Sequence, residues 1–363
     1  MTRYASAALM PLADAATRLV AGVAPVVERR MPAPAALGFA AARDVAADRA
    51  APERPTALRD GWAVEADGVT GASPYAPILL AAPPTWVEAG ELLPAWADTV
   101  LPPEALAGRT LVADAPSGDG VRRAGEDLAA GARVIAAGVR VGPLHLLALA
   151  AAGQAEIPVR APRLALVATG ASVALAGTLA ALIAADGGDP GTPIAVTHDV
   201  AAIAAAIREA TADAVLVLGG TGPGRTDHSV AALALAGDVL AHGIAIRPGE
   251  TAAIGRAEGR PVLLIPGRPE AALAVYLALG RPLLAALSGA HAPEPATGTL
   301  ARKVSATIGV SDVVFVRRCA DGIEPLGGAD LALSRLAEAD GAILVPPERE
   351  GHPEGATVEV LPL

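Results

Sequence analysis

Residues 215–227 read VLVLGGTGPGRTD, an apolar run that breaks into a glycine-rich segment and ends on an acid. Positions 215–218 are all aliphatic, which predicts a strand covered on both faces within a parallel sheet. The glycines that follow permit positive φ and let a ligand approach the backbone; they are Gly219, Gly220, Gly222 and Gly224. Successive N–H groups in such a loop form an anion-binding cavity, and Asp227 is placed to hold a metal or polarise water. The segment therefore predicts a site for a phosphorylated small molecule.

The sequence beyond Pro162 alternates strands and helices. RLALVATG, PIAVTHD, AVLVLGG and PVLLI have strand patterns, whereas TLAALIAADGG and VAAIAAAIREAT have helical ones. Short connections between such segments predict a parallel sheet with right-handed crossovers, which binds ligands at the carboxyl ends of its strands. Four segments fall at such ends: Thr169 with Gly170, His198 with Asp199, residues 219–227 and residues 266–269.

The flanking parts of the chain follow other patterns. Residues 12–27 repeat apolar side chains at helical spacing and predict an amphipathic opening helix. From residue 35 to 159 short apolar pieces alternate with Pro- and Gly-rich turns, which predicts β-rich modules, with a short helix at 142–153. HAPEPATG at 291–298 is typical of a linker, and the strand-rich remainder predicts a small β-domain.

We therefore expect a multidomain α/β fold around a central, doubly wound, mostly parallel α/β domain. The predicted division places an N-terminal helix and β-rich regions at 1–160, the α/β domain at 161–289 and the C-terminal β-domain at 290–363.

Composition excludes several classes of function. The 363 residues carry a formal net charge of −10, so no basic field collects nucleic acid. Cys319 is the only cysteine, which excludes an internal disulfide and a multi-thiolate metal site within one chain. Gly, Pro and charged residues interrupt every apolar run before it reaches about 18 residues, and the amino terminus lacks an export signal. We expect a cytoplasmic protein with no nucleic-acid or membrane partner.

Seven short motifs occur in one order along the chain. They are LRDGWAV at 58–64, AGELLPAWADTVLPPEAL at 89–106, RRAGEDLAAG at 122–131, ATG at 168–170, GGTGPGRTD at 219–227, RPGE at 247–250 and PGRP at 266–269. In this order they resemble the motifs of the molybdopterin molybdenumtransferases, the MoeA family that includes the gephyrin E domain. The resemblance spans nearly the full length, and seven motifs in order are far more specific than a lone glycine-rich loop.

The resemblance implies a homodimeric enzyme that inserts molybdate into adenylylated molybdopterin with a divalent cation, Mg²⁺, and hydrolyses the adenylate. It implies four catalytic acids, of which Asp227 and Asp199 would hold the metal while Asp60 and Asp127 would reach the cleft across the dimer. The implied binding residues for the pterin substrate are Thr169, Gly170, Ser172, Gly219, Gly220, Thr221, Gly222, Gly224, Arg225, Arg247, Pro248, Pro266, Gly267, Arg268 and Pro269. A molybdoenzyme or another cofactor-biosynthesis protein is the implied partner.

The chain departs from the family pattern mainly at the cleft. The family's TGDEL is TGASV here, which removes both acids, and KPGK is RPGE, which places Glu250 where the family has a lysine. Pro223 removes one N–H donor from the glycine loop, and Gly222 removes a serine hydroxyl. Arg225 and Arg268 are candidates to restore positive charge. These changes leave open a catalytically impaired protein that binds or delivers the pterin cofactor.

Each acid also has a purely structural interpretation. Asp227 and Asp199 could cap the helices that follow them, since Asp is a favoured N-cap. Asp60 could be a turn residue before Gly61, and Asp127 could belong to a solvated acidic pair. A nucleotide-dependent oxidoreductase is a further alternative, although the loop lacks the full G-x-G-x-x-G and does not follow the first strand of the sheet.

Overall fold

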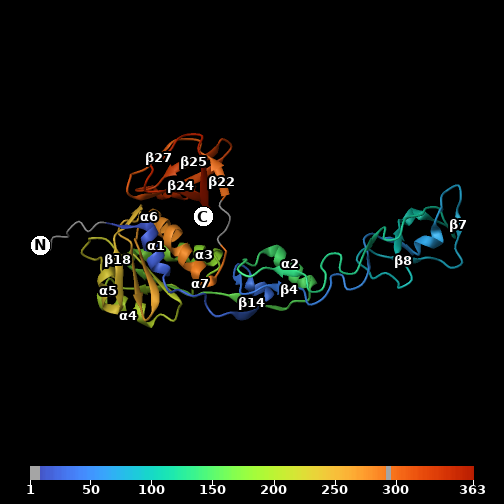
Figure 1. The fold of residues 1–363 in the computed structure, drawn as a ribbon, viewed down its shortest axis with the longest axis horizontal. Helices are drawn as coiled ribbons and strands as arrows, with labels where there is room; N and C mark the ends of the chain where they lie inside the picture. Colours follow the sequence, from blue (N-terminus) through green and yellow to red (C-terminus); the bar gives the residue numbers. More distant parts are fainter. Residues whose placement is uncertain (1–8, 292–295) are drawn as a thin grey trace.

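The computed structural model describes residues 9–291 and 296–363, and Figure 1 shows four parts along its length. A central α/β domain carries a C-terminal β-domain on one side, and two β-rich lobes extend from it in succession. We call the nearer lobe, residues 29–50 and 128–160, the proximal lobe, and the farther one, residues 51–127, the distal lobe.

The central sheet has the strand order β16-β15-β17-β21-β20-β18. Its strands are β15 (Leu164–Thr169), β16 (Ile194–Val196), β17 (Ala214–Leu218), β18 (Asp238–His242), β20 (Ala253–Ala257) and β21 (Arg260–Ile265). The first four in the sheet are parallel, whereas β20 pairs antiparallel with β21, and β18 antiparallel with β20. The prediction of a central, mostly parallel α/β domain is confirmed, and the antiparallel edge makes the sheet mixed.

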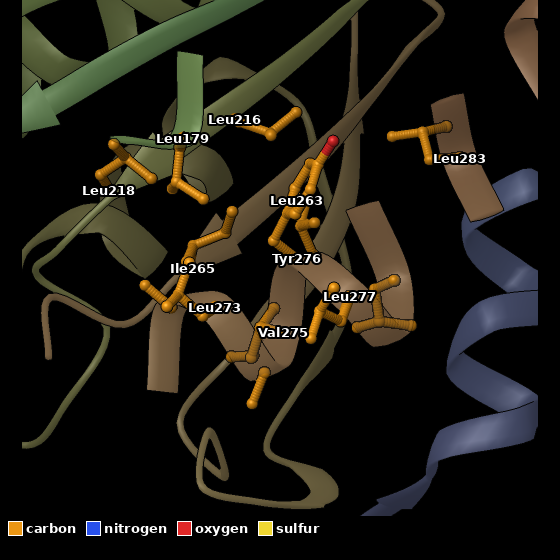
Figure 2. Close-up of a cluster of buried hydrophobic side chains, with 14 of the residues drawn as sticks. Leu179, Leu216, Leu218, Leu263, Ile265, Leu273, Val275, Tyr276, Leu277 and Leu283 are labelled. Carbon is orange, nitrogen blue, oxygen red and sulfur yellow. The ribbon is translucent and has the colours of Figure 1, made fainter. Parts of the chain in front are cut away.

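Helices cover both faces of this sheet. They are α1 (Leu12–Val20), α3 (Val173–Ala185), α4 (Val200–Glu209), α5 (Ser229–Ala236), α6 (Pro269–Val275), the π-helical turn η5 (Tyr276–Gly280) and α7 (Arg281–Ser288), with a 3₁₀ turn η4 (Gly170–Ser172). In β17, Leu216 and Leu218 join the core cluster beneath α3 and α6, whereas Val215 and Val217 join the cluster beneath α4 and α5. Alternate residues of an uninterrupted apolar strand thus bury two opposite faces. Figure 2 shows the first cluster around Tyr276.

The helix at the start of the chain is shorter than predicted. It ends at Val20 rather than residue 27, because Gly22 follows with φ of +70° and Pro25 cannot continue a helix. Ala15 and Leu19 are fully buried in the core of the central domain. The predicted division counted this helix with the β-rich regions of 1–160, but its side chains pack on the central domain.

One described helical run, Pro269–Ser288, is long and apolar enough to cross a membrane by length and composition alone. It comprises α6, η5 and α7, and 72% of an 18-residue stretch within it is buried inside the protein. Tyr276 at its middle is fully buried in the core cluster. The run is therefore accounted for as a core helix of the central domain.

The proximal lobe packs a small sheet and a helix around its own core. Its elements are β2 (Arg29–Pro32), η1 (Ala33–Ala36), β3 (Ala40–Ala41), β4 (Val45–Ala46), β13 (Arg133–Ile135), α2 (Pro143–Ala151) and β14 (Glu156–Arg160). The predicted helix at 142–153 is α2. Its start is stabilised by His145, whose Nδ1 accepts the N–H of Gly142 at 3.0 Å.

The distal lobe is made of short strands, as the sequence pattern predicted. They are β5 (Thr56–Ala57), β6 (Gly61–Val64), β7 (Ile78–Leu79), β8 (Thr85–Val87), β9 (Thr99–Leu101), β10 (Leu106–Ala107), β11 (Thr110–Leu111) and β12 (Val121–Arg122), with 3₁₀ turns η2 (Ala66–Val69) and η3 (Pro103–Ala105). This lobe lies at the opposite end of the molecule from the C-terminal domain and is separated from the central domain by the proximal lobe (Figure 1).

The C-terminal domain shares a sheet with the central domain. Its elements are β22 (Ala296–Thr299), β23 (Val304–Ser305), β24 (Ser311–Cys319), β25 (Gly322–Gly327), α8 (Leu333–Leu336), β26 (Gly341–Val345), β27 (Gly351–His352) and β28 (Thr357–Pro362). Strand β19 (Ile244–Arg247) pairs parallel with β24 and joins it to β1 (Met10–Pro11). In the predicted linker, positions 292–295 lie outside the described residues, and from Ala296 the chain is strand β22 rather than linker.

Candidate functional site

A cleft of about 430 Å³ lies where the loops after β15, β17 and β21 meet at the carboxyl edge of the central sheet. Ten of the predicted site residues line it: Thr169, Ser172, Gly219, Gly220, Thr221, Gly222, Asp227, Pro266, Gly267 and Arg268. They come from three segments, at 169–172, 219–227 and 266–268, that are far apart in sequence. The structure thus brings the glycine loop and two neighbouring strand ends together in one cavity.

The glycine loop begins with two residues in the left-handed region. Gly219 has φ of +86° and Gly220 has φ of +69°. A Cβ on Gly219 would lie 2.7 Å from the Thr169 hydroxyl oxygen, so a side chain here would collide with the neighbouring strand end. The loop is held from below by Ser229, whose hydroxyl donates to the Gly219 carbonyl at 2.6 Å. Glycine is therefore required for both conformation and space.

The cleft contains backbone amides without protein acceptors. The N–H of Gly219 donates to the Ile265 carbonyl at 2.8 Å and so extends the sheet. Within the described part of the chain, no hydrogen bond is formed by the amides of Gly220, Thr221 and Gly222, nor by those of Gly267 and Arg268 before α6. Free amides at a glycine-rich turn and at a helix start are the groups that bind phosphate oxygens.

The carboxylate of Asp227 folds back over the glycine loop. Its Oδ2 accepts the N–H of Gly224 at 2.8 Å. A Cβ on Gly222 or Gly224 would lie 2.9 or 2.7 Å from this oxygen, so both glycines leave room for the acid. Helix α5 begins at Ser229 with His228 at its N-cap position. Asp227 is therefore not the cap of α5, and its carboxylate is part of the cleft wall.

The opposite wall comes from the segment before α6. A Cβ on Gly267 would lie 3.0 Å from the Ser172 hydroxyl, which shows how closely this segment approaches η4. Arg268 is half exposed and forms ion pairs with Glu270 at 3.4 Å and with Asp330 of the C-terminal domain at 2.5 Å. Its positive charge at the cleft is thus largely offset by two carboxylates.

Five lining residues were not among the predicted site residues: His198, Gly249, Glu250, Thr251 and Ala271. His198 lies against Gly170, where a Cβ would overlap the imidazole ring. The Thr251 hydroxyl is 2.9 Å from that of Thr221, and His242 Nε2 lies 3.0 Å from the Thr221 carbonyl oxygen. His198 follows β16 just as Asp199 does, so its place at a strand end is a usable sequence signal, whereas no such signal points to Thr251.

The structure does not bring the other predicted acids into this cleft. Asp199 is the N-cap of α4, and its carboxylate accepts the N–H of Ala201 at 3.2 Å. Asp60 accepts the N–H of Ala89 at 2.8 Å within the distal lobe. Asp127 forms an ion pair with Arg122 at 2.7 Å. In a single chain these three side chains serve local structure.

The RPGE motif at 247–250 contributes different residues to the cleft than the resemblance implies. Arg247 pairs with the buried Asp312 at 2.7 Å, so its guanidinium is directed to the C-terminal domain rather than the cleft. Instead, Gly249 and Glu250 of the same motif line the cleft. The predicted residues outside the lining are Gly170, Gly224, Arg225, Arg247, Pro248 and Pro269.

Side chains that could hold a metal ion are few in this cleft. Among residues 9–291 and 296–363, no group of three or more His, Cys, Asp or Glu side chains is placed to hold one. Two carboxylates, Asp227 and Glu250, do line the cleft. Mg²⁺ is typically held by one or two carboxylates together with substrate phosphates, rather than by an all-protein cage. The residues present therefore fit a magnesium ion only if it is shared with a phosphorylated ligand.

Comparison with protein families matches three regions of the chain. Residues 10–153 match the MoeA N-terminal region (domain I and II), residues 174–286 a probable molybdopterin binding domain, and residues 321–363 the MoeA C-terminal region (domain IV). Molybdopterin molybdenumtransferase 2 of Mycobacterium tuberculosis is 30% identical over 312 residues, which span 73% of this chain and 76% of that relative. Molybdopterin molybdenumtransferase 1 of the same organism is 28% identical over 314 residues, 76% of this chain and 72% of that relative.

Solved structures agree with the sequence relatives. The molybdopterin biosynthesis MoeA protein from Pyrococcus horikoshii superposes with a TM-score of 0.74 at 26% identity, covering 98% of this chain and 99% of that one. A second structure of the MoeA protein from this organism has a TM-score of 0.77 at 20% identity. The likeness extends over all four parts of the fold.

Proposed function

Because this chain belongs to the MoeA family of molybdopterin molybdenumtransferases, we propose that it inserts molybdate into adenylylated molybdopterin in molybdenum cofactor biosynthesis. The observation that carries this proposal is the cleft itself. Gly220, Thr221 and Gly222, whose amides are free, line the same cavity as Gly267 and Arg268, whose amides are also free. Two sets of donors at one sheet edge suit a substrate that bears more than one phosphate.

The chain's own residues have separate tasks in this proposal. The glycine-loop amides bind phosphate oxygens, and the hydroxyls of Thr221 and Ser172 orient the substrate from either side. Asp227 accepts one loop amide through Oδ2, which holds its carboxylate at the cavity. We assign Asp227 the role of orienting the water that attacks the phosphoanhydride.

Mg²⁺ belongs to the proposal as an ion held with the substrate, with Asp227 and Glu250 as the protein carboxylates near it. When bound, it would neutralise charge on the phosphate oxygens. Asp199 has no part in this assignment, because its carboxylate caps α4.

A homodimer is also part of the proposal. The distal lobe, which carries Asp60, is separated from the central domain of its own chain by the proximal lobe (Figure 1). An elongated arm of this kind suits completion of the cleft by the distal lobe of a partner subunit. We propose cytoplasmic activity, with another cofactor-biosynthesis protein or a molybdoenzyme as partner.

The experiment measures molybdate-dependent hydrolysis of adenylylated molybdopterin. We expect Asp227→Ala to reduce turnover at least 100-fold while substrate binding changes by less than tenfold, since general-base groups contribute about 10²–10⁴-fold. Thr226→Ala is the matched control, because Thr226 is an exposed neighbour in the same loop. Tight substrate binding by the unmodified protein without any molybdate insertion would contradict the proposal.

A further inference from the structure

A second cavity, of about 580 Å³, lies at the opposite edge of the central sheet. Arg163 and Asp213 in its wall directly precede β15 and β17, and Arg260 is the first residue of β21. The cleft described above follows the carboxyl ends of the same strands. Strands of this length span roughly 17–20 Å at about 3.3 Å per residue, so the two cavities are separate.

The other wall of this cavity is the irregular segment between α1 and β2. Val23 and Val26 of this segment, with Leu287 of α7, give the wall an apolar surface. The chain passes here on its way to the proximal lobe and returns at Ala161 and Arg163. The cavity therefore lies at the junction between the proximal lobe and the central domain.

Four arginines and one aspartate line the cavity: Arg29, Arg163, Arg256, Arg260 and Asp213. The Asp213 carboxylate accepts the backbone N–H of Arg163 at 2.7 Å. Arg163 also lies 3.9 Å from Asp189. Among the described residues, Arg29, Arg256 and Arg260 form no ion pair within 4.0 Å. In a chain with a net charge of −10, this is a local excess of positive charge.

The existing contacts of these arginines do not neutralise them. Arg256 donates to the Leu19 carbonyl at 3.0 Å at the end of α1, and Arg260 donates to the carbonyl of Arg208 at 2.9 Å near the end of α4. Helix ends carry only partial negative charge. The Nε atoms of Arg29 and Arg260 are buried and have no hydrogen-bond acceptor. These two Nε atoms are closed to solvent, so they add to the uncompensated positive charge of the wall rather than to the donors that a ligand can reach.

We propose that this cavity, which we call the arginine pocket, binds a phosphate monoester of a small organic molecule. Arginine's planar fork matches phosphate oxygens in pairs. The volume lies within the range of about 300–1,000 Å³ found for small-molecule sites, and the apolar wall accommodates the organic part. A bound ligand bridges the segment that carries Arg29 and the sheet edge that carries Arg256 and Arg260. This proposal is independent of the function assigned to the cleft.

The test is isothermal titration calorimetry of the full chain with AMP, inorganic phosphate and adenosine at low ionic strength. AMP and phosphate bind saturably, with AMP tighter, and adenosine binds at least tenfold more weakly than AMP. Arg29→Ala weakens AMP binding at least tenfold. The control is Arg30→Ala, because Arg30 is the exposed neighbour on β2 that pairs with Glu156 at 3.4 Å, and it changes the affinity less than twofold.

A cleft variant distinguishes the two cavities. We expect Arg268→Ala to leave the affinity of the arginine pocket for AMP unchanged. If Arg268→Ala abolishes AMP binding and Arg29→Ala does not, the phosphate binds in the cleft and the proposal is overturned. The proposal would also be overturned if AMP did not bind saturably, or if Arg29→Ala and Arg30→Ala lowered the affinity for AMP equally. If Arg29→Ala does not fold, Arg163→Ala takes its place, since that side chain is 56% exposed and its loss disturbs little packing.

Discussion

Gly219 directly follows the last residue of β17 and is the first residue of the glycine loop in the cleft. Its φ of +86° is strained for any residue with a Cβ, and the Thr169 hydroxyl would lie 2.7 Å from that Cβ. We expect Gly219→Ala to lower the free energy of unfolding by about 2–4 kcal/mol, the sum of backbone strain and forced repacking. Urea denaturation of the purified variant measures it.

Gly309 separates the two contributions. It has φ of +88°, but a Cβ there would meet no atom within 4 Å. Gly309→Ala should therefore show the backbone strain alone, about 1–2 kcal/mol. Equal losses in the two variants would show that the close approach to Thr169 contributes nothing.

Tyr276 predicts how stability changes in alkaline solution. Burial, followed by the nearby Asp186, raises the pKa of Tyr276 above its usual value of 10.0. Figure 2 shows Tyr276 within the buried cluster. Its hydroxyl donates to Asp186 Oδ2 at 2.8 Å. The folded state holds this proton more tightly than the unfolded state does. The contribution of the Tyr276 hydroxyl to the free energy of unfolding is therefore fully present below about pH 10 and is lost as the pH rises further.

Tyr276→Phe removes this dependence. At pH 7 the variant should be less stable by about 1 kcal/mol, the net value of one hydrogen bond, because Arg281 still donates to Asp186 at 2.6 Å. Above pH 10 its free energy of unfolding should fall less steeply than that of the unmodified protein. Tyr75→Phe is the control, since its side chain is 99% exposed. Identical alkaline slopes for all three proteins would contradict the prediction.

At the scale of the element, substitutions of Asp199 can show whether its carboxylate caps a helix or takes part in catalysis. Its backbone is extended, with φ of −117° and ψ of 129°, and its carboxylate caps α4 through Ala201. Asp199→Ala should lower stability by about 1 kcal/mol. Asp199→Ser removes the charge but keeps a good cap, so both stability and molybdate insertion should be retained. Loss of turnover in Asp199→Ser at unchanged stability would show that the carboxylate acts in the cleft.

The sequence predicted those elements whose cause is local. Residues 215–218 are apolar without interruption, and this pattern alone indicates a strand buried on both faces. The rule for strand ends then located most of the cleft lining. The local sequence pattern could not predict the ion pair between Arg247 and Asp312, which are 65 residues apart. That pair depends on how two domains share a sheet. Nor could it show which of His198 and Asp199 faces the cleft, since both follow the same strand.

At the scale of the whole molecule, the C-terminal domain is held by backbone pairing as well as by side chains. Strand β19 pairs with β24 through Ile246 and Ser311, so one sheet crosses the boundary between two domains. Arg268, at the cleft, pairs with Asp330 across the same boundary. A side chain of the C-terminal domain thus contributes to the charge balance at the cleft wall.

Asp312 forms an ion pair with Arg247 across this boundary. It is 3% exposed and accepts from Arg247 at 2.7 Å and from the Thr307 N–H at 2.7 Å. Asp312→Asn should destabilise the protein by about 2–3 kcal/mol, below the ~3–5 kcal/mol of a fully buried pair because Arg247 is 41% exposed. Relative to the unmodified protein, the variant should show a larger increase in amide hydrogen exchange in β19 and β24 than in the strands of the central sheet. Asp330→Asn is the control, because Asp330 is 84% exposed and such pairs contribute about 0–1 kcal/mol. Uniformly faster exchange in every strand would instead mean that Asp312 stabilises the fold as a whole rather than the boundary.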